Sequence, residues 1–145
     1  MMPKVGIAIP ARNEENSIVS VVTLCREFSP HVLVVNDGST DRTEELAKYA
    51  GANVINHEKN RGKGQAISTS MKWAMEQKMD VLVLIDADFQ HDPGNIPDLI
   101  NPILEGDADI TIGSRWKHQE GLREMPFHRI LGNWVLSTAT SLSLS

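Results

Sequence analysis

Two carboxylates one residue apart, Asp86 and Asp88, directly follow the apolar run Val81–Ile85. An uninterrupted apolar run of this length is typical of a strand buried on both faces of a parallel sheet. Burying an unpaired carboxylate is costly, so these two groups are expected to meet a cation or water. Open α/β sheets bind ligands just outside the carboxyl ends of their strands. The pair therefore predicts an oxygen-rich metal site that holds a phosphorylated ligand.

Gln90 adds a third oxygen ligand at the next alternate position. Mg²⁺ and Mn²⁺ prefer carboxylate, carbonyl and water oxygens, and a metal shared with a diphosphate would neutralise charge on a leaving group. His91 is a softer ligand, and Asp92 is expected to cap the following helix. An aspartyl-phosphate phosphohydrolase is an alternative for the same pair. It is disfavoured because Phe89 stands where a small hydroxyl residue would be expected.

Three further loops are expected at the same edge of the sheet. Pro10–Glu15 ends the first predicted strand, and Asn36–Asp41 follows the second. Asp37 could accept hydrogen bonds from a base or a ribose, whereas a turn with Ser39 or Thr40 as the helix cap better explains the rest of that loop. The loop Asn60–Gly64 opens a helix whose N–H groups suit an anion, although a plain helix entry explains it equally well.

Positive charge is expected at two strand ends. Arg12 is not explained by a helix start and, with Pro10, would form a wall for a flat ring. Arg115 follows the last predicted strand, where its planar guanidinium would suit phosphate oxygens. Arg123 and His128, in and after the next loop, are interpreted as solvated surface residues.

Alternating strands and helices must position these loops. The predicted strands are Lys4–Pro10, His31–Val35, Ala52–Ile55, Val81–Ile85 and Ala108–Ile112. The first predicted helix is capped by Asn13 and buries Ile18, Val21, Val22 and Cys25. The third buries Ala66, Ile67, Ser70, Met71 and Ala74. The short connections predict an α/β fold, a mostly parallel sheet with helices on both faces.

Composition fits one compact domain. The 145 residues are 41% hydrophobic and 23% charged, a balance typical of globular rather than disordered chains. The net charge of −5, without a basic stripe, argues against nucleic-acid binding. Cys25 is the only cysteine, so no intramolecular disulfide can form and a reducing compartment is expected. No apolar stretch approaches the ~18 to 20 residues of a membrane span, and the opening residues do not resemble a signal peptide.

Six segments, in order, resemble inverting family 2 glycosyltransferases of the GT-A fold, within the branch of dolichyl- or polyprenyl-phosphate mannose and glucose synthases. They are Ile9–Glu15, Val34–Asp41, Asn60–Gly64, Leu84–Pro93, Ile112–Arg115 and Arg129–Asn133. The resemblance implies a nucleoside-diphosphate sugar donor of the GDP-mannose or UDP-glucose type, with Mg²⁺ or Mn²⁺ as cofactor. It also implies a polyprenyl or dolichyl phosphate acceptor. The expected location is cytoplasmic, peripheral at the cytoplasmic face of the membrane.

The resemblance also assigns roles to individual residues. The implied donor contacts are Pro10, Ala11, Arg12, Glu14, Val35, Asp37, Gly62, Lys63, Asp86, Ala87, Asp88, Gln90, Arg115 and Arg129. Among them, Asp86, Asp88 and Gln90 would hold the metal, with Asp86 also near the ribose. Asp88 and Arg115 would be catalytic because they stabilise the leaving diphosphate.

The sequence departs from the family pattern at three places. Arg12 stands where the family often has an aromatic residue, so guanidinium stacking would replace ring stacking. Asn36 stands where a second aspartate is common, which leaves Asp37 as the single carboxylate. Residues 1–145 are expected to form one nucleotide-sugar-binding domain that is C-terminally short, with a loop and helix over 116–145 toward the acceptor side. A non-catalytic or truncated binding module is therefore the alternative, and an unpaired C-terminal helix would favour a homodimer.

Overall fold

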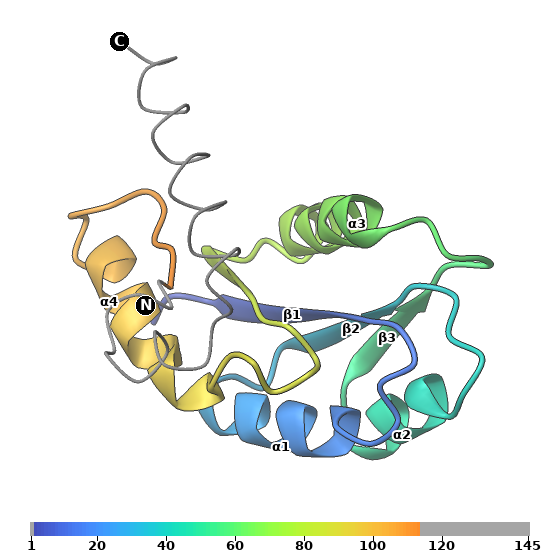
Figure 1. The fold of residues 1–145 in the computed structure, drawn as a ribbon. Helices are drawn as coiled ribbons and strands as arrows, with labels where there is room; N and C mark the ends of the chain where they lie inside the picture. Colours follow the sequence, from blue (N-terminus) through green and yellow to red (C-terminus); the bar gives the residue numbers. More distant parts are fainter. Residues whose placement is uncertain (1, 114–145) are drawn as a thin grey trace, which may run out of the picture. The chain divides into compact units, whose positions relative to one another are not determined.

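Parallel strands and helices alternate along the chain in the computed structural model, which describes residues 2–113 (Figure 1). The strands are β1 (Val5–Ala11), β2 (Val32–Asn36), β3 (Asn53–Asn56) and β4 (Val81–Leu84). The helices are α1 (Ile18–Phe28), α2 (Thr43–Tyr49), α3 (Lys63–Glu76) and α4 (Ile96–Leu104), with the short 3₁₀ helix η1 (Pro93–Asn95) before α4. All of them belong to the compact unit Met1–Thr111.

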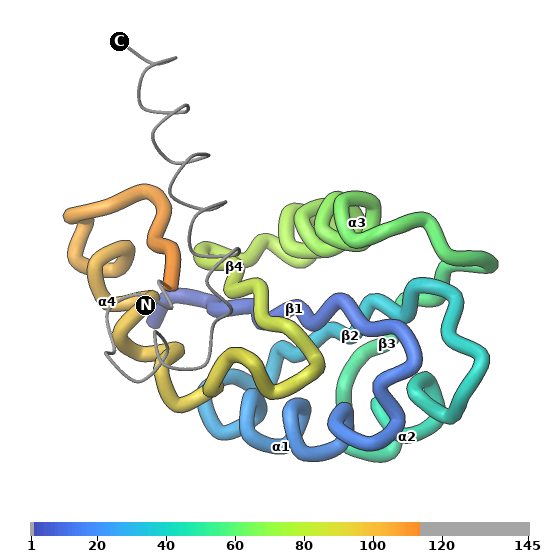
Figure 2. The backbone as a smooth tube through the Cα atoms, in the orientation of Figure 1, coloured from blue at the N-terminus to red at the C-terminus, as the bar shows by residue number. Residues whose placement is uncertain are grey.

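The sheet has the strand order β3-β2-β1-β4, and every neighbouring pair is parallel. Ile7 of β1 lies opposite Val32 of β2 on one side and Val83 of β4 on the other. The predicted α/β fold with a parallel sheet is thereby confirmed. Because the strands are parallel, the loops that follow them lie at one edge of the sheet (Figure 2).

Helices cover both faces of the sheet, as predicted. Figure 1 shows α1 and α2 on one face and α3 on the other. Side chains of β1 alternate accordingly, with Ile7 and Ile9 in the α1-side core and Ala8 in the α3-side core. Cys25 is fully buried on the α1 side, where burial raises the pKa of its thiol to about 12. The prediction of a core cysteine is confirmed.

Two expectations about helices were wrong in detail. α1 begins at Ile18 and not after Asn13, because Asn13 adopts a positive φ of 55° and uses its side chain in a contact between loops. On α3, Met71 is half exposed and Trp73 takes a place in the core instead. A Cβ on Gly6 of β1 would lie 2.9 Å from the Trp73 ring, so the missing side chain of that glycine makes the room.

The strand predicted over Ala108–Ile112 is absent. These residues form no strand, and Ile110 is 78% exposed. A strand needs a hydrogen-bonded neighbour, and within residues 2–113 this segment pairs with none. It is bonded to α4 instead: the N–H of Ala108 donates to the carbonyl of Pro102 at 3.1 Å, and Thr111 Oγ1 donates to the carbonyl of Leu99 at 2.6 Å.

Among the described helices, none has the length and apolar character needed to cross a membrane. The loop and helix expected over 116–145, and the dimer expected through them, lie outside the described residues.

Candidate functional site

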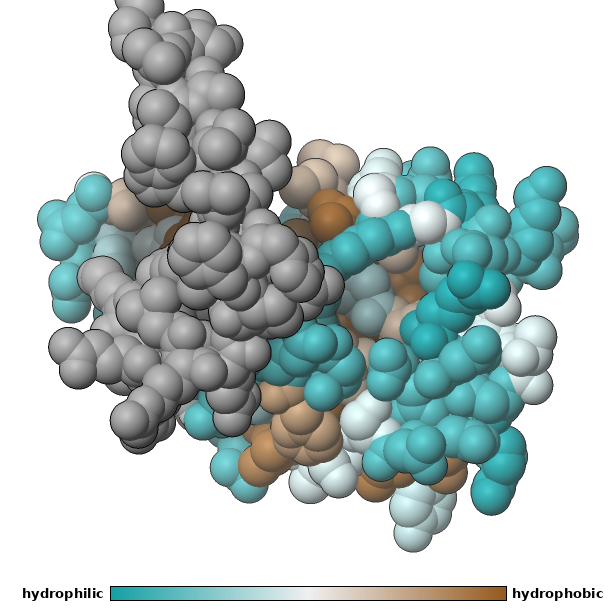
Figure 3. Space-filling model, in the orientation of Figure 1, coloured by the Kyte–Doolittle hydropathy of each residue, from teal (hydrophilic) through white to brown (hydrophobic). Residues whose placement is uncertain are grey.

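The carboxyl-end edge of the sheet gathers the segments that the sequence singled out. β1 is followed in the chain by β2 on one side of it, whereas β4 pairs on the other side, so the topology switches between β1 and β4. Such a switch point opens a crevice at the carboxyl ends of the strands. Figure 3 shows mostly hydrophilic residues over the loops at this end, on the right of the view.

The loops after β1 and β2 hold each other through side chain to backbone bonds. The backbone N–H of Asn13 donates to Ser39 Oγ at 3.0 Å, and the N–H of Thr40 donates to Asn13 Oδ1 at 2.8 Å. The N–H of Glu14 donates to Thr43 Oγ1 at 2.8 Å. Residues that look like local helix caps in the sequence therefore join two different loops.

Asp41, two residues before α2, bonds the first N–H of that helix in place of the predicted cap, Ser39 or Thr40. Its Oδ1 accepts from the N–H of Thr43 at 3.0 Å, and its Oδ2 accepts from the N–H of Glu15 at 3.1 Å. Burial alone would raise the pKa of Asp41, but the hydrogen bonds from Thr43 and Glu15 hold it below its ordinary value. Asp41 therefore stays ionised and ties the same two loops together.

We call the loops Pro10–Glu15, Asn36–Asp41 and Asn60–Gly64 the loop cluster. Asp37 lies within it, and its side chain is only 7% exposed. Its Oδ1 accepts from the N–H of Arg61 at 2.8 Å and contacts His57 Nδ1 at 2.7 Å, while its Oδ2 accepts from the N–H of Gly62 at 2.9 Å. Burial acts to raise the pKa of Asp37, yet the bonds from His57, Arg61 and Gly62 keep it below its usual range. The carboxylate is thus ionised, and it fixes the loop before α3.

Backbone packing reinforces this contact. Gly38 has a positive φ of 67°, and a Cβ built on it would lie 2.5 Å from the backbone nitrogen of Asn60 and 2.6 Å from the carbonyl carbon of Lys59. Only a residue without a side chain fits so close to another backbone. The loop Asn36–Asp41 and the loop Asn60–Gly64 therefore form one unit.

A salt bridge links this unit to β4. Lys63, the first residue of α3, donates from Nζ to Asp86 Oδ1 at 2.7 Å. His91 Nδ1 lies 3.4 Å from Asp86 Oδ2, and this buried nitrogen has no hydrogen-bond partner among the described residues. The ammonium group of Lys63 and the unpaired ring nitrogen of His91 therefore both lie beside Asp86.

The residues predicted to hold a metal lie together after β4, but they form only part of a coordination sphere. Asp88 is exposed, and its Oδ1 accepts from the backbone N–H of Gln90 at 3.0 Å. Within residues 2–113 no group of three or more His, Cys, Asp or Glu side chains could hold a metal ion by itself. Mg²⁺ commonly takes one or two carboxylates and completes its sphere with phosphate and water oxygens. Exposed Asp88 and partly exposed Asp86 supply the one or two carboxylates of that pattern.

The other predicted donor contacts differ in accessibility. Arg12 is exposed and Pro10 is partly exposed beside it at the end of β1. Val35 and Ala87 are buried in the α3-side and α1-side cores, so their side chains pack inside the protein. Ala11 is also buried, and Glu14 is partly exposed. Arg115 and Arg129 lie outside the described residues.

Sequence reasoning missed His57. It directly follows β3, and no motif marks it. The signal that was available is its position, a histidine at the carboxyl end of a strand that neighbours the Asp37 strand. The structure makes it a buried partner of that carboxylate.

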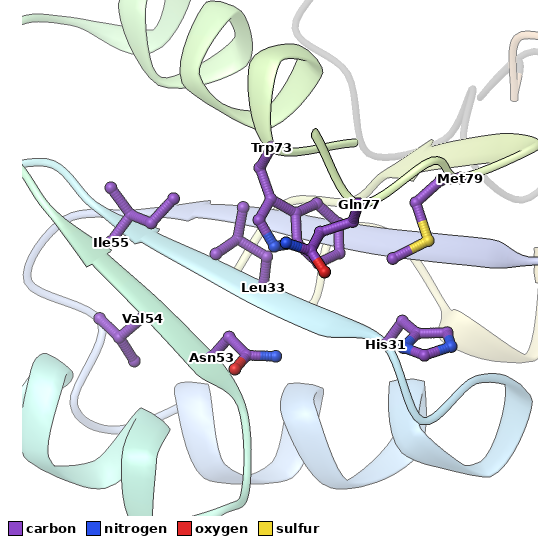
Figure 4. A pocket seen from close by; sticks show the side chains of 8 residues that line it. All are labelled: His31, Leu33, Asn53, Val54, Ile55, Trp73, Gln77 and Met79. Carbon is purple, nitrogen blue, oxygen red and sulfur yellow. The ribbon is translucent and has the colours of Figure 1, made fainter. Parts of the chain in front are cut away.

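A cavity of about 310 Å³ lies elsewhere, beside α3 and the strands β2 and β3 (Figure 4). It is lined by His31, Asn53 and Met79, at or just before the beginnings of β2, β3 and β4, together with Trp73 of α3 and Gln77, which directly follows α3. It therefore opens toward the amino ends of the strands, away from the loop cluster. Ligands of open α/β sheets bind at the carboxyl ends, so the loop cluster remains the candidate site.

Comparison with known proteins shows the family of the chain. The sequence profile of Glycosyl transferase family 2 matches residues 6–142. An uncharacterized protein of Methanocaldococcus jannaschii is 36% identical over 140 residues, covering 96% of this chain and 58% of that protein. The UDP-N-acetylglucosamine–dolichyl-phosphate N-acetylglucosaminyltransferase of Methanococcus voltae is 35% identical, covering 94% of this chain and 61% of that protein. The chain thus spans about 60% of the length of these curated relatives.

Among solved structures, glucosyl-3-phosphoglycerate synthase from Mycobacterium tuberculosis, in complex with Mn²⁺, UDP-glucose and phosphoglyceric acid, superimposes with a TM-score of 0.62 at 30% identity. The match covers 72% of this chain and 40% of that one. The same enzyme has also been crystallised with Mg²⁺ and UDP. The described sheet is therefore a GT-A fold.

Proposed function

Since the chain belongs to glycosyl transferase family 2, we propose that it binds a nucleoside-diphosphate sugar at the carboxyl-end edge of its sheet and transfers the sugar with inversion. The observation that carries the proposal is the Lys63–Asp86 contact, at 2.7 Å. It joins the loop cluster around Asp37 to the Asp86–Asp88 segment after β4. The two halves expected for a nucleotide-sugar site, one for the nucleoside and one for the diphosphate, are thereby part of one surface.

The nucleoside half is formed by the loops after β1 and β2. Asp37 accepts three hydrogen bonds from described residues, two at Oδ1 and one at Oδ2. A carboxylate offers about four acceptor positions, so one on Oδ2 is left for an N–H of a base. Exposed Arg12 would stack its guanidinium on the base, next to Pro10.

The diphosphate half is formed by α3 and the end of β4. Lys63 would give its charge to the phosphates, while Asp86 would accept from the ribose hydroxyls. Asp88, with Asp86 and Gln90, would hold Mg²⁺ or Mn²⁺ against the diphosphate. A bound metal supplies positive charge that stabilises the leaving diphosphate. Arg115 and Arg129 would add contacts to donor or acceptor phosphates.

The acceptor proposed is a polyprenyl or dolichyl phosphate, as the name of the Methanococcus voltae relative states for that protein. A phosphate oxygen of the acceptor attacks the anomeric carbon from the face opposite the diphosphate. A new carbon–oxygen bond forms as the bond to the donor phosphate breaks, which inverts the configuration. Such a phosphate is already ionised at neutral pH, so no base has to remove a proton. The reaction would take place at the cytoplasmic face of a membrane.

Isothermal titration of the whole chain with UDP-glucose and with GDP-mannose, each with and without Mn²⁺, tests the proposal. Binding to wild type should strengthen with Mn²⁺, and Asp88→Ala should remove that gain. Asp107→Ala, an exposed aspartate in the turn after α4, is the matched control and should bind like wild type. Equal, weak binding under all conditions by wild type and Asp88→Ala would defeat the metal-dependent site. Binding without transfer to a polyprenyl phosphate would favour the binding-module alternative.

A further inference from the structure

His57 is a buried histidine to which the proposed chemistry assigns no role. Its side chain is 5% exposed and lies between two elements. Nδ1 is 2.7 Å from Asp37 Oδ1, after β2, and Nε2 is 2.9 Å from Thr69 Oγ1, on α3. The backbone N–H of His57 also donates to the carbonyl of Asn36 at 2.9 Å. Both ring nitrogens and the main chain are therefore engaged at once.

The hydrogen bonds determine which ring nitrogen of His57 donates to Asp37. An ionised Asp37 can only accept, so Nδ1 must carry the hydrogen of that contact. Thr69 Oγ1 is also 3.0 Å from the carbonyl of Gln65, one turn earlier on α3. The hydroxyl can give its single hydrogen either to Gln65 or to Nε2. In both arrangements the donor toward Asp37 is the same.

The orientation of the Asp37 carboxylate determines the path of the next loop. The oxygen that meets His57 also accepts from the N–H of Arg61, and the other oxygen accepts from the N–H of Gly62. Rotation of the carboxylate would break both bonds together. Gly62 immediately precedes Lys63, whose ammonium reaches Asp86. A chain of contacts thus runs from His57 to the diphosphate half of the site.

We propose that His57 is a positioning residue of the donor site, which orients the Asp37 carboxylate so that the loop Asn60–Gly62 presents Lys63 and the start of α3 to the donor. This inference rests on the proposed function for the identity of the ligand. Its structural part, the hold of His57 on the loop through Asp37, stands independently of that function.

Substitutions that keep one ring nitrogen at a time test the proposal. His57→Asn places an amide N–H near the position of Nδ1, His57→Gln places one near Nε2, and His57→Leu removes both. His57→Asn should bind the donor nearly as well as wild type. His57→Gln and His57→Leu should bind it roughly tenfold or more weakly, the loss expected for one hydrogen bond to a charged group. The probe is UDP-glucose or GDP-mannose, whichever wild type binds, with Mn²⁺.

Hydrogen exchange of the Arg61 and Gly62 amides in the ligand-free chain provides the second measurement. Protection should persist in His57→Asn and fall in His57→Gln, while the amide of Val34 in β2 reports that the sheet is intact. Equal donor binding by His57→Asn and His57→Gln, with unchanged Arg61 and Gly62 exchange, would overturn the inference. If wild type bound no nucleotide, the proposed function would fail, and the exchange comparison would still decide the role of His57 in holding the loop.

Discussion

Lys63 and Asp86 meet at 2.7 Å, although the 22 residues between them in the chain include the rest of α3. Lys63 begins α3 and Asp86 follows β4, so the contact spans the two sides of the site. The lysine side chain is 66% exposed and the aspartate 23%. An exposed ion pair of this kind adds little to stability. Its place at the carboxyl-end edge of the sheet makes it a candidate for ligand binding instead.

Replacing Lys63 separates these two roles. Lys63→Met should change the free energy of unfolding by less than ~1 kcal/mol, because the pair is exposed to water. It should weaken nucleoside-diphosphate binding roughly tenfold or more, since a charge-assisted contact to phosphate is lost. Urea unfolding and isothermal titration measure the two effects. Lys72→Met, an exposed lysine of α3 that lies 3.9 Å from Glu76, is the control and should leave binding unchanged. A large loss of stability with intact binding would contradict the assignment.

The close approach of two loops at Gly38 predicts that alanine will destabilise the protein at Gly38 but not at Gly64. Gly38→Ala forces a Cβ to within 2.5 Å of the Asn60 nitrogen at a positive φ. It should destabilise the protein by ~1 to 3 kcal/mol. Gly64→Ala meets nothing within 4 Å. Because Gly64 lies in α3, this alanine should raise the free energy of unfolding by ~0.4 to 1 kcal/mol. Denaturant unfolding of both variants would refute the loop packing if Gly38→Ala were as stable as wild type.

The lowered pKa of Asp37 predicts a pH dependence of stability. An unfolded aspartate titrates near pH ~3.9, and the folded group titrates lower. The stabilisation is therefore complete above the unfolded value and is lost as the pH falls through the folded value. Asp37→Asn should be less stable than wild type at pH 7. The NH₂ of the new amide is a donor and cannot accept the hydrogen bond that the N–H of Gly62 gives to Asp37 Oδ2. The difference should shrink below about pH 4.

Unfolding of wild type and Asp37→Asn in urea at several pH values measures this difference. Asp41 also has a lowered pKa, but it is present in both proteins, so its contribution cancels in the comparison. A gap in stability that stayed constant between neutral and acidic pH would show that the Asp37 charge does not stabilise the fold.

The thiol of Cys25 should be unreactive in the folded protein. Its side chain is fully buried on α1, and burial raises the pKa of the thiol to about 12. Because the thiolate is the reactive form, iodoacetamide at pH 8 should label the native chain very slowly. Labelling should become complete in denaturant, and mass spectrometry can follow both. Rapid labelling of the native chain would mean that α1 opens readily from the sheet.

The sequence alone was enough for the elements that depend on local pattern. The run Val81–Ile85 predicted a strand, and β4 lies there at Val81–Leu84. The expected burial on both faces was wrong, because Leu84 is 40% exposed. The spacing of Ile18, Val21, Val22 and Cys25 predicted the buried face of α1, which the structure confirms. The prediction of a strand over Ala108–Ile112 was wrong because a strand also needs a neighbour, and within residues 2–113 this segment pairs with none.

The candidate site was predictable only where chemistry is visible in residue type. Asp86 and Asp88 could be singled out as candidate ligand-binding groups, because two carboxylates directly after an apolar run have no packing role. Asn13 was misread as a helix cap, because its hydrogen bond to Thr40 joins loops that are distant in sequence. His57 was missed for the same reason.

By itself, the sequence determined the parallel α/β class, the family resemblance and the carboxylates at the end of β4, since these follow from local periodicity and residue type. The tertiary structure alone decided that Asp37 accepts from the backbone N–H groups of Arg61 and Gly62, that His57 contacts it, and that Lys63 reaches Asp86. The physical reason is that hydrogen bonds and ion pairs act over about 3 Å in space. Chain folding, not spacing along the sequence, brings such groups within that distance.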